Sequence, residues 1–420
     1  MNEALERVRR SARYSLPDFN RLRQQAVDLA TQLTIGRSAF LESFGVQSEL
    51  EYKQQAMRDN HIMYHAHIGM NDIDATTQAL VRIHEELSHK EYRLDRAGFA
   101  IDRRMGLPPG MRAAAAAETG PMLAQDEDWQ SLAQAAPIQP HLGDFMIGQP
   151  ASVGNAVQAL RIGCTTIGNL SQYFTFEAPG WSDTAETAAQ TYTAMALLGQ
   201  FREQGAMLHS YLEDGFGALF QHCSSVAAWA MLERYLVEEL IGTRLTHCIG
   251  GLTRDPLKRA GWVLALHKIH RGEQVGSMIY GDTLSFGHEF ENNRAATAEY
   301  LLWDMLVQLH APSGHAVLPL PVTEAIRIPS ADEIIEALLF GRRVEQSARR
   351  LYPHVDFSAA DAFAETVCRE GGKIYQNALS GLADMGVDIT NPLQMLYVLT
   401  KLGPLGFEQL LAVDQASGHE

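Results

Sequence analysis

Eight short apolar runs alternate with long helix-patterned segments between about residue 60 and residue 350, and no other feature constrains the fold as strongly. A strand buried on both faces reads as a nearly continuous apolar stretch, and a parallel neighbour needs a crossover, usually a helix. We therefore expect eight parallel strands in chain order, closed into a (β/α)8 TIM barrel. The runs are residues 61–69, 98–104, 141–148, 165–173, 206–212, 245–250, 275–281 and 315–321.

The chain has 420 residues, whereas a barrel of this kind takes roughly 250, so the sequence predicts extensions on both sides. Ser330 followed three residues later by Glu333 is a capping box, which predicts a helix directly after the last strand. Further helices are expected beyond it, broken at Gly371-Gly372 and at Pro392. The predicted parts are an N-terminal helical extension (1–58), the barrel (59–352) and a C-terminal helical extension (353–420).

The composition excludes several classes of partner. Lys and Arg total 34 against 50 Asp and Glu, which gives a formal net charge of −16. Nucleic-acid binding needs a cationic surface, so no nucleic-acid partner is expected. No apolar stretch approaches the roughly 20 residues of a membrane span, and the first residues show no apolar segment typical of a secretory signal. Four scattered cysteines without a Cys-x-x-Cys pair fit a reducing compartment, so we expect a cytoplasmic protein.

Polar side chains accumulate where the eight predicted strands end, which is where a (β/α)8 barrel carries its chemistry. Because the carboxyl ends of parallel strands meet at one rim, these side chains are expected to lie close together. The residues expected near that rim are His65, Asp102, Asn169, Tyr211 and Asp282.

Four histidines in these runs suggest an alternative, a divalent-metal centre. His65 and His67 are two residues apart on one predicted strand, so both rings point to the same side. Imidazoles from two other strands, His209 and His247, would complete a set suited to a metal-dependent hydrolase. Such a site normally includes a carboxylate after the last strand, but the segment PLPVTEA has no Asp there. Histidines held in the core by hydrogen bonds are the other interpretation.

Three segments are similar to one known family. EAIRIPSADEI (324–334) is similar to the EAIGIPT segment after that family's last strand, and FTFEAPGWSDTAETAAQTY (174–192) to its strand-four loop. LPDFNRLRQQAVDLATQLTIGR (16–37) is similar to the helix before its barrel. The three occur in the family's order along nearly the whole chain. The chain therefore resembles the epsilon (barrel) subunit of glutamate mutase (methylaspartate mutase), an adenosylcobalamin-dependent enzyme that rearranges carbon skeletons.

The resemblance implies a cofactor and a partner. In this family adenosylcobalamin (coenzyme B12) carries the radical chemistry, and the corrin lies over the mouth of the barrel, which keeps water out. The corrin comes on a separate small cobalamin-binding subunit with an Asp-x-His-x-x-Gly motif, whose His binds cobalt. No such motif occurs in this sequence, so the chain would be one subunit of a heteromer. Whether it also forms a homodimer stays open.

The resemblance also implies a change of substrate. Met146 stands in place of an arginine that grips a carboxylate, Leu170 in place of a glutamate that handles the amine, and Phe176 in place of a tyrosine. Arg103 and Arg104 could retain one carboxylate contact, because a planar guanidinium binds carboxylate bidentately. With most of the arginine clamp missing, glutamate itself is not the expected substrate.

We therefore predict a radical mutase (an isomerase) acting on another carboxylate or amino acid. The alternatives are the metal-dependent hydrolase and a barrel that uses no corrin, as a lyase or a non-catalytic partner. Glu324 matches the family glutamate that contacts the adenosyl ribose, and Glu177 and Glu213 are candidates to face an amine. The predicted site residues are Glu177, Glu213 and Asp282 for catalysis; Arg103, Arg104, Asn169, Tyr173, Phe176 and Tyr211 for the substrate; and Glu324, Thr323, Pro108, Gly110 and Gln149 for the cofactor, with no metal ligand.

Overall fold

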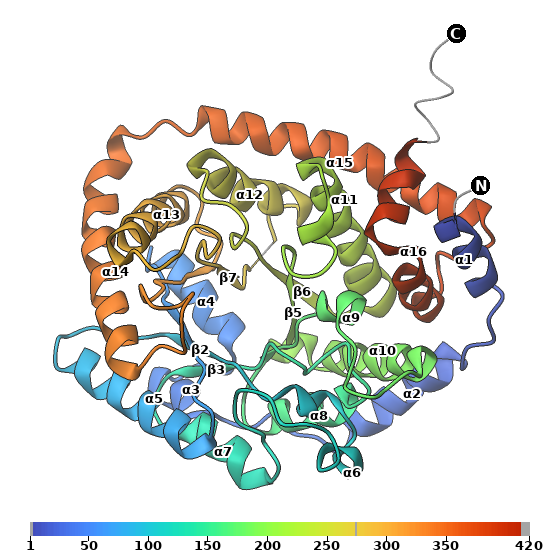
Figure 1. The fold of residues 1–420 in the computed structure, drawn as a ribbon, viewed down its shortest axis with the longest axis horizontal. Helices are drawn as coiled ribbons and strands as arrows, with labels where there is room; N and C mark the ends of the chain where they lie inside the picture. The colour runs from blue at the N-terminus through green and yellow to red at the C-terminus, as the bar shows by residue number, and fades with distance from the viewer. Residues whose placement is uncertain (1–2, 274, 413–420) are drawn as a thin grey trace.

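The computed structural model describes residues 3–273 and 275–412 and is 57% helical. The described residues form eight short strands, which lie near the middle of the molecule with helices around them (Figure 1). Each strand overlaps one of the eight apolar runs. The strands are β1 (His65–Ile68), β2 (Arg96–Phe99), β3 (Gln139–His141), β4 (Thr166–Ile167), β5 (Met207–Tyr211), β6 (Arg244–Cys248), β7 (Met278–Ile279) and β8 (Ala316–Val317).

The strands form three separate sheets, β1-β2-β3, β4-β5-β6 and β7-β8, and all pairs within them are parallel. Between the sheets, the described residues show only isolated bridges, which join Leu142 to Ile167, Ile249 to Ile279, and Tyr64 to Val317. The prediction of a closed (β/α)8 barrel is therefore wrong, because regular pairing stops at the edges of each small sheet.

The strands are shorter than the apolar runs because backbone turns and buried polar groups interrupt them. The run at 165–173 pairs only over β4, since Gly168 has a left-handed φ of 84° and a short helix begins at Gln172. β2 begins at Arg96 and β3 at Gln139, which are both buried although they are polar. A search for apolar runs misses such strand starts and places these two strands too late.

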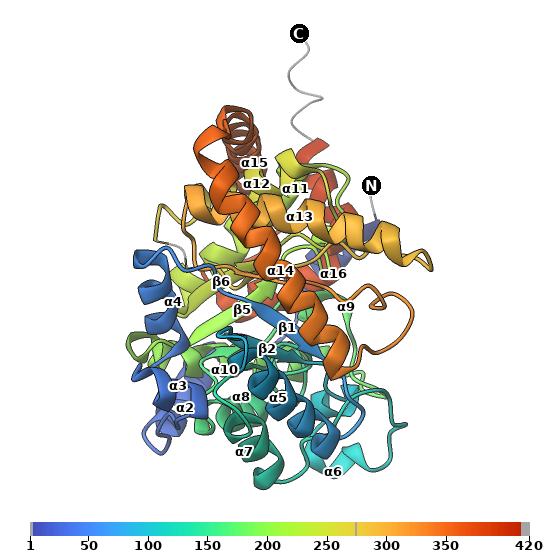
Figure 2. The same ribbon diagram turned by 90° about the vertical axis from the view of Figure 1, so that its left-hand side faces the viewer.

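Helices cover the outside of the sheets, and apolar side chains from both layers form one large core. The helices of this part are α5 (Ile73–Ser88), α6 (Pro109–Arg112), α7 (Asp126–Gln134), α8 (Ser152–Arg161), α9 (Gln172–Thr175), α10 (Thr184–Gln200), α11 (Cys223–Arg234), α12 (Pro256–Ile269), α13 (Phe290–His310) and α14 (Ala331–Leu351). In Figure 2, α5, α7 and α14 lie outside β1 and β2, and α5 contacts both other helices. The predicted capping box is confirmed at the start of α14, where Ser330 and Glu333 cap each other's backbone N–H.

The N-terminal helices pack onto this body. α1 (Glu3–Ser11) contacts α16 (Pro392–Ala412), and α2 (Phe19–Ala30) contacts α10. α3 (Ala39–Phe44) and α4 (Glu49–Arg58) follow, and α4 inserts buried charged side chains among the strands. Residues 1–2 and 413–420 of the predicted extensions lie outside the described residues.

The C-terminal helix α15 (Ser358–Asp384) lies against α11 and α12 (Figure 1). It runs without interruption through Gly371 and Gly372, so the predicted break there is wrong. Gly371 instead permits close helix packing, because a Cβ there would lie 2.8 Å from the Cβ of Ala227 in α11. The break at Pro392 is confirmed, since α16 begins there. None of the described helices is long and apolar enough to cross a membrane.

Candidate functional site

A cavity of about 650 Å³ opens where the strands end. Its volume lies within the ~300–1,000 Å³ typical of small-molecule sites. The lining segments come from all three sheets and from the loop after β8. The side chains with polar groups that line it are His67, Thr119, His141, Asp144, Asn169, His209, Tyr211, Asp214, Tyr280, Glu324 and Arg327.

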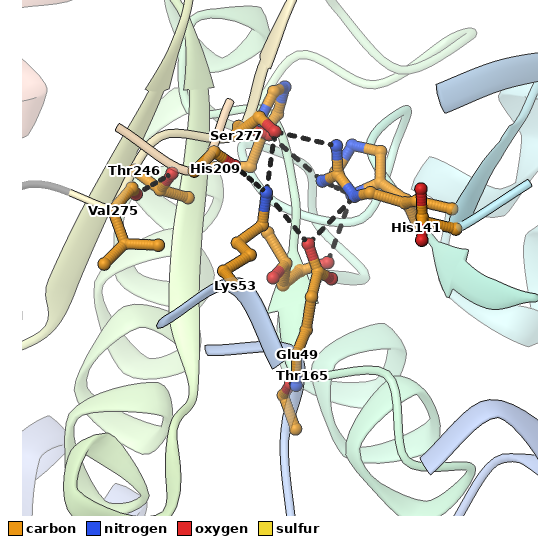
Figure 3. A network of polar contacts seen from close by, with 12 residues as sticks. Glu49, Lys53, His141, Thr165, His209, Thr246, Val275 and Ser277 are labelled. Atoms are coloured by element: carbon orange, nitrogen blue, oxygen red, sulfur yellow. Dashed lines mark hydrogen bonds and ion pairs between the residues drawn. The ribbon is translucent and has the colours of Figure 1, made fainter. Parts of the chain in front are cut away.

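A buried network of charged and polar groups joins α4 to His141, His209 and Ser277 beside this cavity (Figure 3). At its centre, Arg96 Nε lies 3.0 Å from Glu49 Oε1, and both side chains are fully buried. Arg96 Nη2 donates to Ser277 Oγ at 3.0 Å and to His141 Nδ1 at 2.7 Å. Arg96 is thus paired with a carboxylate of α4, and this pairing helps to explain why the charged start of β2 can be buried. Lys53 of the same helix lies 3.6 Å from the same carboxylate, and burial lowers its pKa to about 7.

The contact with Arg96 fixes the tautomer of His141. A guanidinium can only donate, so Nδ1 of His141 must accept and the ring proton must sit on Nε2. The carbonyl of Thr166 lies farther from Nδ1, at 3.3 Å. Burial, with the Arg96 charge second, holds the pKa of His141 well below its usual value, so the ring is neutral. His141 lines the cavity, is 2% exposed, and its Nε2 has no hydrogen-bond partner among the described residues.

The imidazole rings of three further histidines form a chain of neighbouring rings with His141. The ring of His141 lies 4.7 Å from that of His209 and 5.9 Å from that of His65, which is 5.0 Å from His67. Burial and Arg96 lower the pKa of His67 to about 4, and burial holds those of His65 and His209 well below their usual value. All four rings are therefore neutral near pH 7.

The four histidines of the metal-centre alternative do not lie together. His247 lies elsewhere, with Nε2 3.0 Å from Glu233 Oε2 and Nδ1 2.9 Å from His270 Nε2. Within the described residues, no group of three or more His, Cys, Asp or Glu is arranged to hold a metal ion. The histidines of the cavity lie beside a buried guanidinium, which disfavours a second cation among them.

Three carboxyl groups line the cavity. Asp144 accepts from Gln172 Nε2 at 2.9 Å, and Asp214 accepts from Asn169 Nδ2 at 2.8 Å. Burial, with the charge of Asp214 second, raises the pKa of Asp144 to about 6. Burial also raises the pKa of Asp214, and it raises that of Glu324 to about 7. We call Asp144, Asp214 and Glu324 the acidic wall.

Two tyrosines form another face of the cavity. The rings of Tyr211 and Tyr280 stack at 5.2 Å with an interplanar angle of 12°. Tyr280 Oη lies 3.2 Å from His67 Nδ1. Gly251 makes room for this pair, because a Cβ there would lie 1.7 Å from Tyr211 Oη. Burial raises the pKa of both phenols, so both hydroxyls stay protonated and can donate.

A second, smaller cavity of about 380 Å³ is lined by three of the six predicted substrate residues. Arg103 lies there, donates to the backbone carbonyl of Glu177, and is 3.7 Å from the Glu118 carboxylate. Arg104 makes a bidentate contact with Asp102, at 3.0 and 2.9 Å. Neither arginine lines the larger cavity. The predicted residues in the smaller cavity are Arg103, Gln149, Tyr173, Phe176 and Glu177.

The other predicted residues make local contacts outside the larger cavity. Glu213 accepts from the N–H of Gly250, and burial raises its pKa. Asp282 is buried and accepts from the N–H of Leu284 at 3.0 Å. Thr323 donates to Glu333 at 3.1 Å. Pro108 precedes α6 and Gly110 lies within it, and neither lines the cavity. The larger cavity therefore unites only Asn169, Tyr211 and Glu324 from the predicted site, together with His67 and His209 from the metal alternative.

Sequence reasoning assigned no role to His141, Asp144, Asp214 or Arg96. A signal existed for Arg96, a charge that opens the short apolar stretch Arg96–Phe99. No protein-family model matches this chain, and no curated protein matches it significantly. Function must therefore be argued from the cavity and from the three local similarities.

Proposed function

We propose that this chain is the substrate-binding subunit of an adenosylcobalamin-dependent carbon-skeleton mutase whose corrin is carried by a small partner subunit. The observation that carries the proposal is the cavity at the strand ends, with Glu324 in its wall and apolar side chains exposed on the loops after the strands. Glu324 also opens the segment with the best local similarity to the glutamate mutase family.

The Glu324 carboxyl fits a contact with the hydroxyl groups of an adenosyl ribose. It lines the cavity and takes no hydrogen bond from any described residue. Because its pKa is raised to about 7, it can accept or donate near neutral pH. When bound, the cofactor would supply the hydrogen-abstracting radical chemistry.

The loops that follow the strands expose large apolar side chains. A partner that covered this end would bury them, and surfaces of this kind typically mark interaction sites. Ile326 and Ile328 also line the cavity, so the same partner would close it and keep water out. The exposed side chains, between 37% and 67% exposed, are Met111, Phe176, Leu252, Leu284, Ile326 and Ile328.

The residues of this chain would bind and orient the substrate. The Nε2–H of His141 donates to a substrate oxygen, and the phenols of Tyr211 and Tyr280 offer further donors that keep their protons. No free guanidinium from the described residues lines the cavity, because Arg327 lies 2.6 Å from the Glu333 carboxylate. This arrangement lacks a dicarboxylate clamp, so glutamate remains an unexpected substrate.

Spectral titration of adenosylcobalamin tests the proposal. The isolated chain and the chain mixed with a small Asp-x-His-x-x-Gly subunit encoded beside it would each be titrated. We expect at least about tenfold tighter binding by the mixture, because the cobalt ligand and the cavity lie on different subunits. Equally tight binding by the isolated chain, or no complex between the two proteins, would contradict the proposal.

Matched surface variants locate the docking surface. Leu284→Glu and Ile326→Glu place charge on the loops around the cavity and should weaken the complex at least about tenfold. Leu351→Glu changes a similarly exposed leucine (44%) at the end of α14 and should leave the complex unchanged. Equal weakening by all three variants would show that the loops are not the docking surface.

A further inference from the structure

The charges of the larger cavity are unbalanced. Asp144, Asp214 and Glu324 line it, and their hydrogen-bond donors, where they have any, are neutral amides: the side chains of Gln172 and Asn169 and the backbone N–H of Gly215. Arg327 lines it too, but it is paired with Glu333 outside the acidic wall. No described cation therefore compensates the acidic wall, and burial penalises its ionised form.

A second, independent feature points to a ligand. The Nε2–H of His141 is buried, unpartnered and directed away from the Arg96 contact on the opposite edge of the ring. A Cβ at Gly143 would lie 3.0 Å from this nitrogen, and Gly143 lines the same cavity. A buried donor without an acceptor is costly, so a ligand oxygen at this position would relieve it.

We infer that the cavity recognises a small aliphatic primary amine that carries one oxygen-bearing group. The ammonium lies against the acidic wall, and the oxygen accepts from His141 Nε2. A dicarboxylate is disfavoured, because a second carboxylate would face Asp144 and Asp214 without a cation. This inference rests on the proposed function for the identity of the cavity as the substrate site, and it names the substrate class.

A matched panel of five-carbon ligands tests the inference by calorimetry on the full-length chain alone. The panel is 5-aminopentanol, 5-aminopentanoate, pentylamine and glutarate. We expect the two oxygen-bearing amines to bind at least about tenfold more tightly than glutarate, and pentylamine to bind about fivefold more weakly than 5-aminopentanol. The first two ligands distinguish a hydroxyl from a carboxylate as the oxygen source. Glutarate binding as tight as the amines, or no amine binding up to about 10 mM, would overturn the inference.

Isosteric variants test the acidic wall directly. Asp144→Asn keeps the acceptor for Gln172 and removes the charge, so it should weaken 5-aminopentanol binding at least about tenfold. Asp214→Asn is the second variant, should the first fail to fold. Asp332→Asn removes an equal charge from the exposed surface of α14 and should leave binding unchanged. Unchanged amine binding in both wall variants would overturn the inference.

The two proposals fail separately. Amine binding by a chain that never assembles with a corrin-bearing subunit would reject the mutase and retain the amine site. A corrin complex whose chain prefers glutarate would retain the mutase and reject the amine site.

Discussion

Two polar regions meet at the cavity, and only one of them contains an ion pair. Beneath His141, the charge of Arg96 is paired with Glu49 from α4, and both side chains are fully buried. In the acidic wall, Asp144 and Asp214 receive only neutral amide donors. A charge that the fold needs is paired within the fold, whereas one left unpaired is available to a ligand. The first region should therefore govern stability, and the second should govern binding.

Breaking the paired region should give the largest effect. Arg96→Met removes the partner of Glu49 and the hydrogen bonds to His141 and Ser277. Loss of one member of a buried ion pair typically costs about 3–5 kcal/mol. We expect a marked fall in Tm, measured by differential scanning fluorimetry. Asp214→Asn, its counterpart in the acidic wall, should change Tm little. Equal falls in Tm in the two variants would contradict the assignment of stability to the first region and of binding to the second.

Glu324→Gln tests whether the acidic wall also serves the cofactor. The wild-type heteromer should bind adenosylcobalamin more tightly than methylcobalamin, because only the former carries an adenosyl group whose ribose hydroxyls could contact Glu324. Charge-assisted hydrogen bonds contribute about 1.5–3 kcal/mol, so the variant should lose about tenfold or more of this preference. Glu336→Gln, on the surface of α14, is the control. A preference that survives in Glu324→Gln would reject the ribose contact.

The sequence predicted the strands better than their pairing. Runs buried on both faces are recognisable from composition, so the eight strands fall in or beside the predicted runs. Strand length depends on features that apolar periodicity does not report, such as the left-handed turn at Gly168 and the buried charge of Arg96. The prediction of a closed barrel was wrong for that reason. Gly371 shows the same limit, because a glycine that breaks a helix and one that permits close packing are identical in sequence.

The candidate site was predictable only in part. Tyr211 ends β5 and Asn169 lies two residues after β4, so the strand-end rule found both, whereas the local similarity pointed to Glu324. The tautomer of His141 is set by its contact with Arg96. Arg96 in turn is paired with Glu49, a residue 47 positions earlier and on another element. Such a chain of partners becomes visible only in three dimensions. The rule also selected Arg104, whose nearest partner turned out to be its sequence neighbour Asp102.

The acidic wall should make amine binding depend on pH. Asp144 has a pKa raised to about 6 and Glu324 one raised to about 7, so both ionise between pH 5 and pH 8. His67, with a pKa near 4, stays neutral over most of this range, as do the phenols of Tyr211 and Tyr280, and an aliphatic amine stays protonated. The affinity for 5-aminopentanol should therefore rise about tenfold from pH 5 to pH 8. Calorimetry at both pH values measures it, and a flat or falling affinity would contradict the role of the wall.

The smallest expected effect is a gain in stability. The pKa of Asp144 is higher in the folded chain, at about 6, than its usual 3.8, so its ionised form destabilises the fold. This penalty is absent below the unfolded pKa and fully present above pH 6. Asp144→Asn should therefore stabilise the ligand-free chain by about 1 kcal/mol at pH 8, since the cavity leaves one side of the carboxyl open. At pH 4 the gain should nearly vanish. Thermal melts of both proteins at the two pH values measure this difference, and a variant that is less stable than wild type at pH 8 would show that Asp144 supports the fold, as Arg96 does.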